Sequence, residues 1–359
     1  MNMSSNTELK IVADENIPYA LEAFSLLGSV TLLKGRDITA NDLQQADILL
    51  VRSVTRVNQA LLDGTSVKFV ASATAGFNHI DLEYLQLQNI GFARAPGSNA
   101  TSAAEYVLAG ICYWSLQHQI NLQNISVGII GYGNVGSRVK RLCDAMGMRC
   151  IANDPPLQEQ GMAELNSIDA ALACDIVTLH LPLSLQGKHA TSQLLNKQRI
   201  TQLEPNTLFI NASRGEVVDE TALLERMQIQ NDLSLILDVW ENEPAISLEM
   251  LRYTLIGTPH IAGYSLDGKI RGTEMIYQAC CKFLDKQPRW SVAEVDFGKQ
   301  QKYDFTKFTH NDHRKAILEA YDIFADNNRL KCLLDDRTLD VGKYFDDLRK
   351  NYPARREYS

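Results

Sequence analysis

The sequence predicts an α/β protein made of two doubly wound parallel sheets and a small C-terminal α+β domain. Short apolar runs alternate with helical patterns over the first hundred residues, and six further apolar runs follow from residue 127 onward. The spacing of these runs leaves room for a crossover helix between successive strands, as a parallel sheet requires. Beyond about Trp290 the alternation gives way to a charged segment that contains aromatic residues. The 359 residues suffice for two or three domains.

The first predicted unit is an open α/β fold over residues 9–100, completed by about residues 275–289. Its apolar runs and helical patterns are short and are separated by polar turns. The expected strands are 9–13, 48–51 and 68–71, and the expected helices are 18–27 and 83–88.

The second predicted unit covers residues 101–274. A long helix is expected to begin at Ser102, because Ser102 and Glu105 have the spacing of a capping box, in which each side chain satisfies a free backbone N–H. Six strands are then expected at 127–131, 149–153, 175–181, 207–212, 234–239 and 254–258. Residues 290–359 form the third predicted element.

Composition limits the classes of partner. The net charge is −8, so no overall positive field attracts nucleic acid or an acidic membrane surface. The seven cysteines lack any Cys-x-x-Cys spacing, which argues against a disulfide framework and against a zinc site. The N-terminal segment has no apolar signal core, and no apolar stretch is long enough to cross a bilayer. We therefore expect a cytoplasmic protein without a metal site.

A glycine motif indicates a dinucleotide site. Gly131, Gly133 and Gly136 follow the apolar run 127–130 directly and open a helix through Asn134 and Val135. Glycines at this spacing permit a tight turn and a close approach of the backbone to a pyrophosphate, while the helix N-terminus offers free N–H groups. Glycine turns between a strand and a helix also occur without a ligand, so the motif alone leaves both interpretations open.

Asp154 favours the dinucleotide interpretation. It ends the apolar run 150–153, eighteen residues after Gly136, where a carboxylate can accept hydrogen bonds from the adenosine ribose. The same charge repels a 2′-phosphate, so NAD is expected rather than NADP. The alternative role for Asp154 is to cap the turn before Pro155 and Pro156.

Three further residues supply the chemistry of hydride transfer from a 2-hydroxy acid. Arg214, Glu243 and His260 each follow a predicted strand, and open α/β sheets bind ligands beyond the carboxyl ends of their strands. Such a reaction needs a base for the hydroxyl proton and a cation for the carboxylate. His260 is the expected base, Glu243 its partner, and Arg214 the cation that pairs with a carboxylate. Taken singly, each could be an ordinary loop residue.

At these residues the chain resembles the D-isomer-specific 2-hydroxyacid dehydrogenase family. Four segments carry the resemblance, in order: 131–136, 211–219, 238–244 and 257–263. Supporting stretches extend it over essentially the whole chain, namely 13–19, 51–55, 73–76, 95–99, 154–156, 264–273 and 348–352.

The resemblance implies roles for individual residues. Arg214 and Glu243 would be active-site residues, and His260 would be the proton donor and acceptor. NAD would contact the glycine turn and its helix, and also Asp154, Leu181, Asp238 and Gly263; Leu181 stands where the family pattern leads us to expect threonine. Substrate would contact Ser53, Thr74 and Tyr264. Residue chemistry, rather than the resemblance, adds the backbone N–H groups around Gly76 as binders of carboxylate or phosphate, and Arg52 or Lys269 as charge for a phosphate.

The resemblance also implies an activity and an assembly. We expect two Rossmann-like domains, the first a substrate-binding lid, and a homodimer built through residues 290–359. The expected reaction is the NAD-dependent oxidation of 4-phospho-D-erythronate to 3-hydroxy-2-oxo-4-phosphooxybutanoate in the biosynthesis of pyridoxal 5′-phosphate. Two alternatives stay open: another 2-hydroxy acid such as 3-phosphoglycerate, and a non-catalytic NAD(H)-sensing protein of the corepressor type. No nucleic-acid or membrane partner is expected.

Overall fold

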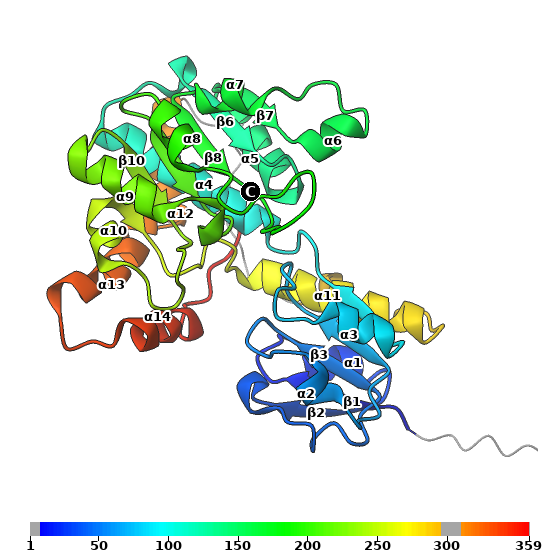
Figure 1. Cartoon of the computed structure of the whole chain (residues 1–359). Helices are drawn as coiled ribbons and strands as arrows, with labels where there is room; N and C mark the ends of the chain where they lie inside the picture. Colours follow the sequence, from blue (N-terminus) through cyan, green and yellow to red (C-terminus); the bar gives the residue numbers. More distant parts are fainter. Residues whose placement is uncertain (1–7, 296–309, 359) are drawn as a thin grey trace, which may run out of the picture. The chain divides into compact units, whose positions relative to one another are not determined.

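The computed structural model describes residues 8–295 and 310–358, which form two compact units. Unit 1 comprises residues 8–99 and 265–295, and unit 2 comprises residues 100–264 and 310–358. Each unit contains a single parallel sheet with helices packed on it (Figure 1). The two parallel-sheet units are as the sequence predicted.

The sheet of unit 1 has five parallel strands in the order β2-β1-β3-β4-β5. The strands are β1 (Lys10–Asp14), β2 (Ser29–Leu33), β3 (Ile48–Val51), β4 (Phe69–Ser72) and β5 (Gly91–Arg94). The central strands β1, β3 and β4 confirm the predicted runs. Strands β2 and β5 were not predicted, because they lie at the sheet edges, are half exposed and lack a continuous apolar run.

Helices cover this sheet on both faces. The shorter ones are α1 (Ala20–Phe24), α2 (Gln59–Leu62) and α3 (Leu82–Leu87), and the long one is α11 (Leu266–Phe283). Single-turn 3₁₀ segments lie at η1 (Gly35–Asp37) and η4 (Val292–Glu294). The sequence placed the end of the second unit at residue 274, whereas all of α11 belongs to unit 1.

Packing explains why α11 joins unit 1. Tyr277 is fully buried and meets Phe24 edge to face, with ring centroids 5.5 Å apart. The Thr273 hydroxyl donates to the Pro18 carbonyl at 2.8 Å. The helix begins at residue 266 because the Ser265 hydroxyl caps it by accepting from the Gly268 N–H at 2.9 Å.

The sheet of unit 2 has six parallel strands in the order β11-β10-β9-β8-β6-β7. They are β6 (Ser126–Ile130), β7 (Arg149–Asn153), β8 (Ile176–Leu179), β9 (Leu208–Asn211), β10 (Ser234–Leu237) and β11 (Thr254–Gly257). All six predicted strands are confirmed. From β6 the chain first adds β7 on one side and then returns to add β8 on the other, so a topological switch point lies between β6 and β8.

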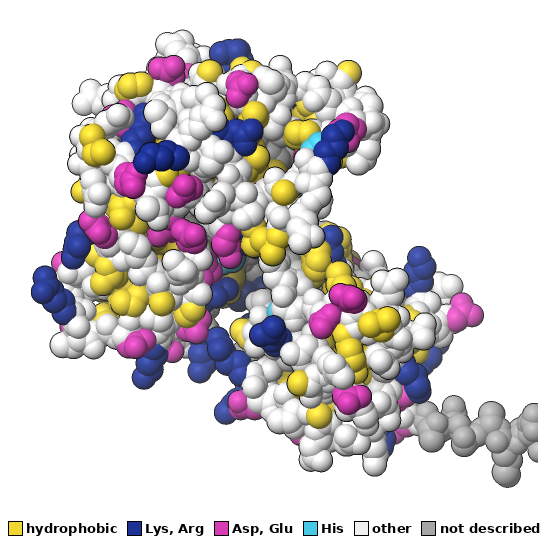
Figure 2. All heavy atoms as spheres, viewed as in Figure 1, with side chains coloured by type: hydrophobic (Ala, Val, Ile, Leu, Met, Phe, Trp, Pro, Cys, Tyr) yellow, Lys and Arg dark blue, Asp and Glu magenta, His cyan; other side chains and the backbone are white. Residues whose placement is uncertain are grey.

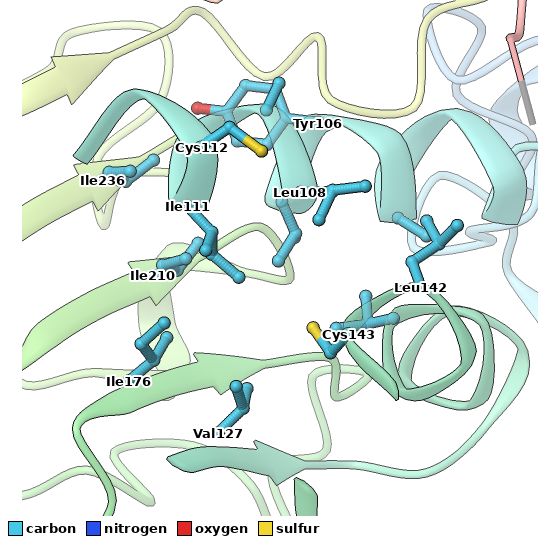
Figure 3. Packing of buried hydrophobic residues seen from close by; sticks show 14 of the residues in the cluster. Tyr106, Leu108, Ile111, Cys112, Val127, Leu142, Cys143, Ile176, Ile210 and Ile236 are labelled. Carbon is cyan, nitrogen blue, oxygen red and sulfur yellow. The ribbon is translucent and has the colours of Figure 1, made fainter. Parts of the chain in front are cut away.

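The helix α4 (Ala100–Gln117) runs through the core of unit 2. Figure 3 shows its residues Leu108 and Ile111 facing Ile210 and Ile236 of the sheet. The predicted capping box is wrong: the helix begins at residue 100, so Ser102 and Glu105 lie inside it and are buried. Glu105 instead accepts a hydrogen bond from the backbone N–H of Tyr358 at 2.7 Å.

Six further helices lie in unit 2 before residue 264 among the described residues. They are α5 (Asn134–Ala145), α6 (Pro155–Glu159), α7 (Ile168–Leu172), α8 (Lys197–Gln202), α9 (Glu220–Ile229) and α10 (Leu248–Tyr253). Of these, α5 and α9 are the longest. Single-turn 3₁₀ segments occur at η2 (Leu122–Asn124) and η3 (Gly215–Val217).

The described C-terminal residues belong to unit 2. They form α12 (His310–Ala320), α13 (Ile323–Asp335) and α14 (Val341–Lys350), and residues 310–358 contain no strand. The predicted α+β composition is therefore corrected to helical for these residues, whose apolar side chains recur at helical spacing. The Asn327 amide oxygen accepts from the Gly257 N–H at 2.9 Å, which ties α13 to the end of β11. The predicted dimerisation role stays a prediction.

The surface charges and the polarity of the helices bear on the class of protein. Lysine and arginine are interspersed with aspartate and glutamate over the face seen in Figure 2, without a patch of one sign. Among residues 8–295 and 310–358, every helix is too short or too polar to cross a membrane.

Candidate active site

The glycine turn after β6 has the backbone geometry that only glycine accepts. Gly131 has φ of +91°, and a Cβ atom there would lie 2.5 Å from the His180 carbonyl oxygen. A Cβ on Gly136 would lie 2.0 Å from the Gly131 carbonyl oxygen, so α5 packs closely on the turn. Beside Gly133 the space is open. No side chain caps the N-terminus of α5, which leaves its N–H groups facing that space.

Asp154 stands at the end of β7, beside this turn. One carboxylate oxygen accepts from the Tyr132 N–H at 2.9 Å, and the other caps α6 by accepting from the Leu157 N–H at 3.1 Å. The structure therefore confirms the capping role that was the alternative for Asp154. A carboxylate has about four acceptor positions, so two of them remain for ribose hydroxyls. The cap and the ribose role are compatible.

Leu181 and His180 follow β8, across the switch point from the glycine turn. The Leu181 side chain lies against Gly131, 2.9 Å from where a Cβ would be. The His180 Nε2 atom is 2.9 Å from the Thr178 hydroxyl, while its Nδ1 is buried and has no hydrogen-bond partner among the described residues. Burial lowers the pKa of His180 to about 3, so the ring is neutral.

His260 and Glu243, which the sequence predicts to be partners in catalysis, are in hydrogen-bond contact in the structure. His260 Nδ1 and a Glu243 carboxylate oxygen are 2.7 Å apart, and the other oxygen accepts from the Trp240 N–H at 3.1 Å. Burial raises the pKa of Glu243, but the charge and hydrogen bond of His260 outweigh it and hold this pKa below its usual value. The ionised Glu243 fixes the ring through Nδ1, so Nε2 is the ring nitrogen that this pair leaves unused.

Asp238 anchors the loop that presents His260. Its carboxylate accepts from the Ile261 N–H at 2.7 Å, from the Ala262 N–H at 2.9 Å and from the Thr258 hydroxyl at 2.7 Å. Its carbonyl accepts from the His260 N–H at 2.7 Å. These bonds hold His260 at φ of +55°, which a histidine adopts only when its surroundings impose it.

A second layer braces the same loop. The Trp240 indole N–H donates to the Thr258 carbonyl at 3.0 Å, and the Tyr106 and Thr258 hydroxyls are 2.7 Å apart. Trp240 and Tyr106 are almost fully buried. No local sequence pattern predicts these contacts, because the partners are up to 152 residues apart in the chain.

Arg214 follows β9 in the same region. Its backbone is held by Asn211, whose side-chain amide donates to the Arg214 carbonyl at 3.0 Å. Its guanidinium donates to the Ser213 carbonyl at 2.6 Å. Burial lowers the pKa of Arg214, with Glu243 opposing that shift and Arg349 adding to it.

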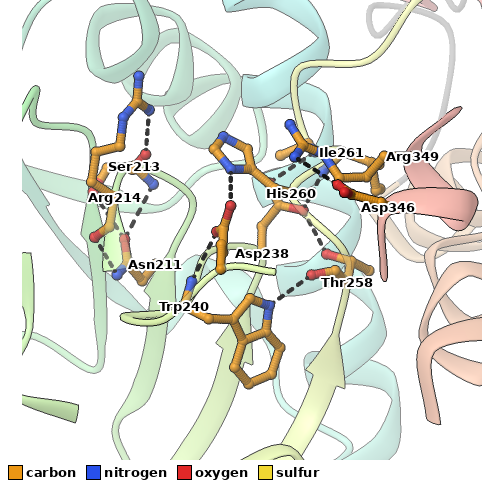
Figure 4. A network of polar contacts seen from close by, with 12 residues as sticks. Asn211, Ser213, Arg214, Asp238, Trp240, Thr258, His260, Ile261, Asp346 and Arg349 are labelled. Atoms are coloured by element: carbon orange, nitrogen blue, oxygen red, sulfur yellow. Dashed lines mark hydrogen bonds and ion pairs between the residues drawn. The ribbon is translucent and has the colours of Figure 1, made fainter. Parts of the chain in front are cut away.

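Arg349 of α14 is the residue that the sequence reasoning missed. The stretch 348–352 supported the family resemblance, but it suggested no role for any of its members. In the structure Arg349 lies beside His260, together with Asp346 (Figure 4). Only the docking of the C-terminal helices on unit 2 reveals this placement.

The substrate residues predicted in unit 1 lie beyond the carboxyl ends of β3 and β4. The Thr74 hydroxyl donates to the Gly76 carbonyl at 3.1 Å and is 2.8 Å from the Ser72 hydroxyl, which is 3.0 Å from His79 Nε2. Burial lowers the pKa of His79 to about 4. This chain of contacts fixes the Thr74 hydroxyl, and Ser53 follows β3 as an exposed residue.

Two cations lie near these residues. The Arg52 guanidinium contacts the buried Asp14 carboxylate through Nε at 2.9 Å and Nη2 at 3.3 Å. Burial lowers the pKa of Lys269, and the Arg52 charge adds to that shift. Asp14 and Arg52 end β1 and β3, so this pair marks the switch point of the first sheet.

Comparison with known proteins decides the family. A family profile described as D-isomer specific 2-hydroxyacid dehydrogenase, NAD binding domain, matches residues 99–262. The erythronate-4-phosphate dehydrogenase of Cellvibrio japonicus is 43% identical over 98% of this chain and 93% of its own length. The chain belongs to the D-isomer-specific 2-hydroxyacid dehydrogenase family. The relatives of the same name from Hahella chejuensis and Klebsiella pneumoniae are 42% and 41% identical, each over 98% of this chain and 93% of the relative.

Solved structures agree with this membership at the level of the fold. A D-lactate dehydrogenase from Aquifex aeolicus, complexed with NAD and lactic acid, aligns over 77% of this chain and 95% of its own with a TM-score of 0.62 and 24% identity. A 3-phosphoglycerate dehydrogenase from Entamoeba histolytica, with NAD bound, aligns over 79% of this chain and 98% of its own with a TM-score of 0.65 and 24% identity.

This dehydrogenase uses NAD, and the glycine turn fits that cofactor. The space beside Gly133 and the uncapped N-terminus of α5 suit a pyrophosphate, and the free acceptor positions of Asp154 suit a ribose. The contacts predicted for Leu181, Asp238 and Gly263 stay predictions. For Asp238 the structure gives a loop-anchoring role, since its carboxylate is already occupied.

The fit at Asp154 gives a first testable prediction. D154N removes the charge and keeps the cap on α6 through its one amide oxygen, while its NH2 group replaces the oxygen that accepts from the Tyr132 N–H. We expect the KM for NAD to rise about tenfold and the preference for NAD over NADP to fall, because a charge-assisted hydrogen bond is lost. Steady-state kinetics with each nucleotide measures both, with the exposed Asp169→Asn as the matched control. An unchanged preference would contradict the ribose role.

Proposed function

We propose that the enzyme oxidises 4-phospho-D-erythronate at C2, giving 3-hydroxy-2-oxo-4-phosphooxybutanoate, in the biosynthesis of pyridoxal 5′-phosphate. The observation that carries the proposal is the near-full-length similarity to erythronate-4-phosphate dehydrogenases, at 40–43% identity, in a chain whose His260 and Glu243 are paired at 2.7 Å. We also propose that the protein is cytoplasmic and forms a homodimer, as the family resemblance implies.

In the proposed reaction His260 is the base. Its Nε2 takes the proton of the C2 hydroxyl while the hydrogen on C2 leaves with both electrons of the broken C–H bond. NAD, when bound, accepts that hydride. The negative charge of Glu243 then stabilises the protonated ring, and in the reverse direction the ring returns its proton to the carbonyl oxygen.

Arg214 is the proposed cation for the substrate carboxylate. Its guanidinium is planar and presents several N–H donors, which match the two carboxylate oxygens. One of those donors is used by the Ser213 carbonyl, so the group is fixed while others remain available. The same charge stabilises the carbonyl oxygen as it forms at C2.

The remaining substrate contacts are proposed from the resemblance and from local geometry. Ser53, Thr74 and Gly76 offer hydroxyl and backbone groups in unit 1, and the Thr74 hydroxyl is held by Ser72. Tyr264 ends the loop that begins at Thr258 and is proposed as a further contact.

One assay tests the proposal. NADH formation is followed by absorbance with 4-phospho-D-erythronate, 3-phosphoglycerate and lactate offered in parallel. We expect the specificity constant for 4-phospho-D-erythronate to exceed the other two by about 100-fold or more, since a misfitting polar group leaves charged donors unpaired. A preference for 3-phosphoglycerate would identify another dehydrogenase of the family. Tight NADH binding without turnover of any of the three would identify a sensor instead.

A further inference from the structure

The C-terminal helix α14 carries an arginine into the catalytic region of unit 2. The Asp340 side chain caps the helix by accepting from the Lys343 N–H at 2.7 Å, and the fully buried Phe345 sets which face packs inward. Arg349 lies one turn later on the same face, with its guanidinium carbon 5.9 Å from the Phe345 ring centroid. Figure 4 shows Arg349 on the side of His260 away from Arg214.

The guanidinium of Arg349 is only partly satisfied. Its Nε atom is buried and has no hydrogen-bond partner among the described residues, and its ion pair with Asp346 is long at 4.0 Å. Burial lowers the pKa of Arg349, but the charges of Tyr264 and Glu243, together with a hydrogen bond to the Tyr264 side chain, outweigh that effect and raise it. A buried donor without a partner is costly, so it indicates a missing acceptor. Arg52 differs, because Asp14 already occupies its Nε and Nη2.

The charges around His260 also suit a substrate that carries more than one anionic group. Arg214 and Arg349 are close enough to repel, since the charge of Arg349 contributes to lowering the pKa of Arg214. Glu243, the carboxylate whose charge acts on both arginines, is already bonded to His260 and Trp240. Glu216 acts on Arg214 as well, and Asp346 acts on Arg349. Two guanidinium groups on opposite sides of the base therefore suit a substrate with an anionic group on each side of its reacting carbon.

We propose that Arg349 binds the phosphate of the substrate and makes the enzyme selective for phosphorylated 2-hydroxy acids. The inference rests on the proposed function. With C2 at His260 and the C1 carboxylate at Arg214, the C3–C4 end of the molecule leads away from Arg214, toward Arg349. A guanidinium then offers its planar pair of donors to the phosphate oxygens.

The test compares two substrates that differ only in the phosphate, 4-phospho-D-erythronate and D-erythronate. R349M keeps the length and the packing on Phe345 but removes the charge. We expect its kcat/KM to fall about 100-fold with the phosphorylated substrate and to stay within about threefold with D-erythronate, as for the loss of one or two charge-assisted hydrogen bonds. R349K should lie between R349M and the wild type. K350M, on an exposed residue of the same helix, is the matched control and should behave as wild type.

The outcomes separate Arg349 from the proposed function. An equal loss of kcat/KM on both substrates would overturn the assignment, because Arg349 would then act in the oxidation step that both share. No loss of kcat/KM on either substrate would overturn it as well, because Arg349 would then have no part in the reaction. If the wild type oxidises neither compound, the proposed function fails. Calorimetric titration of inorganic phosphate into the NADH-loaded protein then tests the phosphate-binding role of Arg349 separately. Weaker phosphate binding by R349M than by wild type and K350M supports it, whereas equal binding, or none by any of the three, overturns it.

Discussion

H260N is expected to lower kcat by about 1,000-fold, because general acid–base catalysis contributes about 100- to 10,000-fold. Asparagine suits this site for two reasons. It tolerates the φ of +55° that the loop imposes, whereas alanine would add backbone strain, and its amide can still donate to Glu243. It has no group that takes up a proton near neutral pH. The measurement is kcat together with the single-turnover rate constant of NADH formation, because product release does not contribute to the latter and so cannot hide the chemical step.

The control for this variant is H118N, on an exposed histidine of unit 2 that lies outside the catalytic region. Its kcat should equal that of the wild type. NADH affinity and the thermal unfolding temperature should be unchanged in H260N. Turnover within about tenfold of the wild type would show that His260 is not the base, since even modest acid–base catalysis exceeds that factor.

The parts of the fold that the sequence predicted are those with a local signal. The six strands of unit 2 are continuous apolar runs, since a parallel strand covered on both faces has no polar side. The edge strands β2 and β5 lack that signal and were missed. The Ser102–Glu105 pattern imitated a helix start, but Glu105 is buried in α4 and bonded to Tyr358, which lies 253 residues away.

The candidate site divides in the same way. Arg214, Glu243 and His260 each follow a strand in sequence, so the rule for the carboxyl ends of parallel strands predicts them as site residues. The bracing by Tyr106 and Trp240, and the arrival of Arg349, depend on contacts between distant segments. The sequence predicts a cofactor contact for Asp238 but not its burial. In the structure the buried Asp238 carboxylate accepts hydrogen bonds from the loop that carries His260.

E243Q is expected to lower kcat by about 1,000-fold or more, by analogy with the loss of the carboxylate in a serine-protease triad. Glutamine has nearly the same shape but no charge, and it keeps one acceptor oxygen where Glu243 uses two, for the Trp240 N–H and for His260. It can therefore no longer stabilise the protonated ring of His260. The pKa of Glu243 is held low by His260, which shows that the carboxylate is ionised and that its charge is what the variant removes. KM for the substrate and NADH affinity should change little. E243D, which keeps the charge, should recover part of kcat, whereas a purely structural role would make E243D at least as harmful as E243Q.

The double variant H260N/E243Q gives the sharper test of this pairing. Because Glu243 acts through His260, removing both should cost no more in kcat than H260N alone, as residues that act as one unit are strongly non-additive. The 2.7 Å contact between the two side chains is the structural basis for this expectation. Losses that multiplied would mean that Glu243 acts independently of His260. Its other oxygen, bonded to the Trp240 N–H, would then be the contact that matters, because that bond holds the strand-end loop after β10.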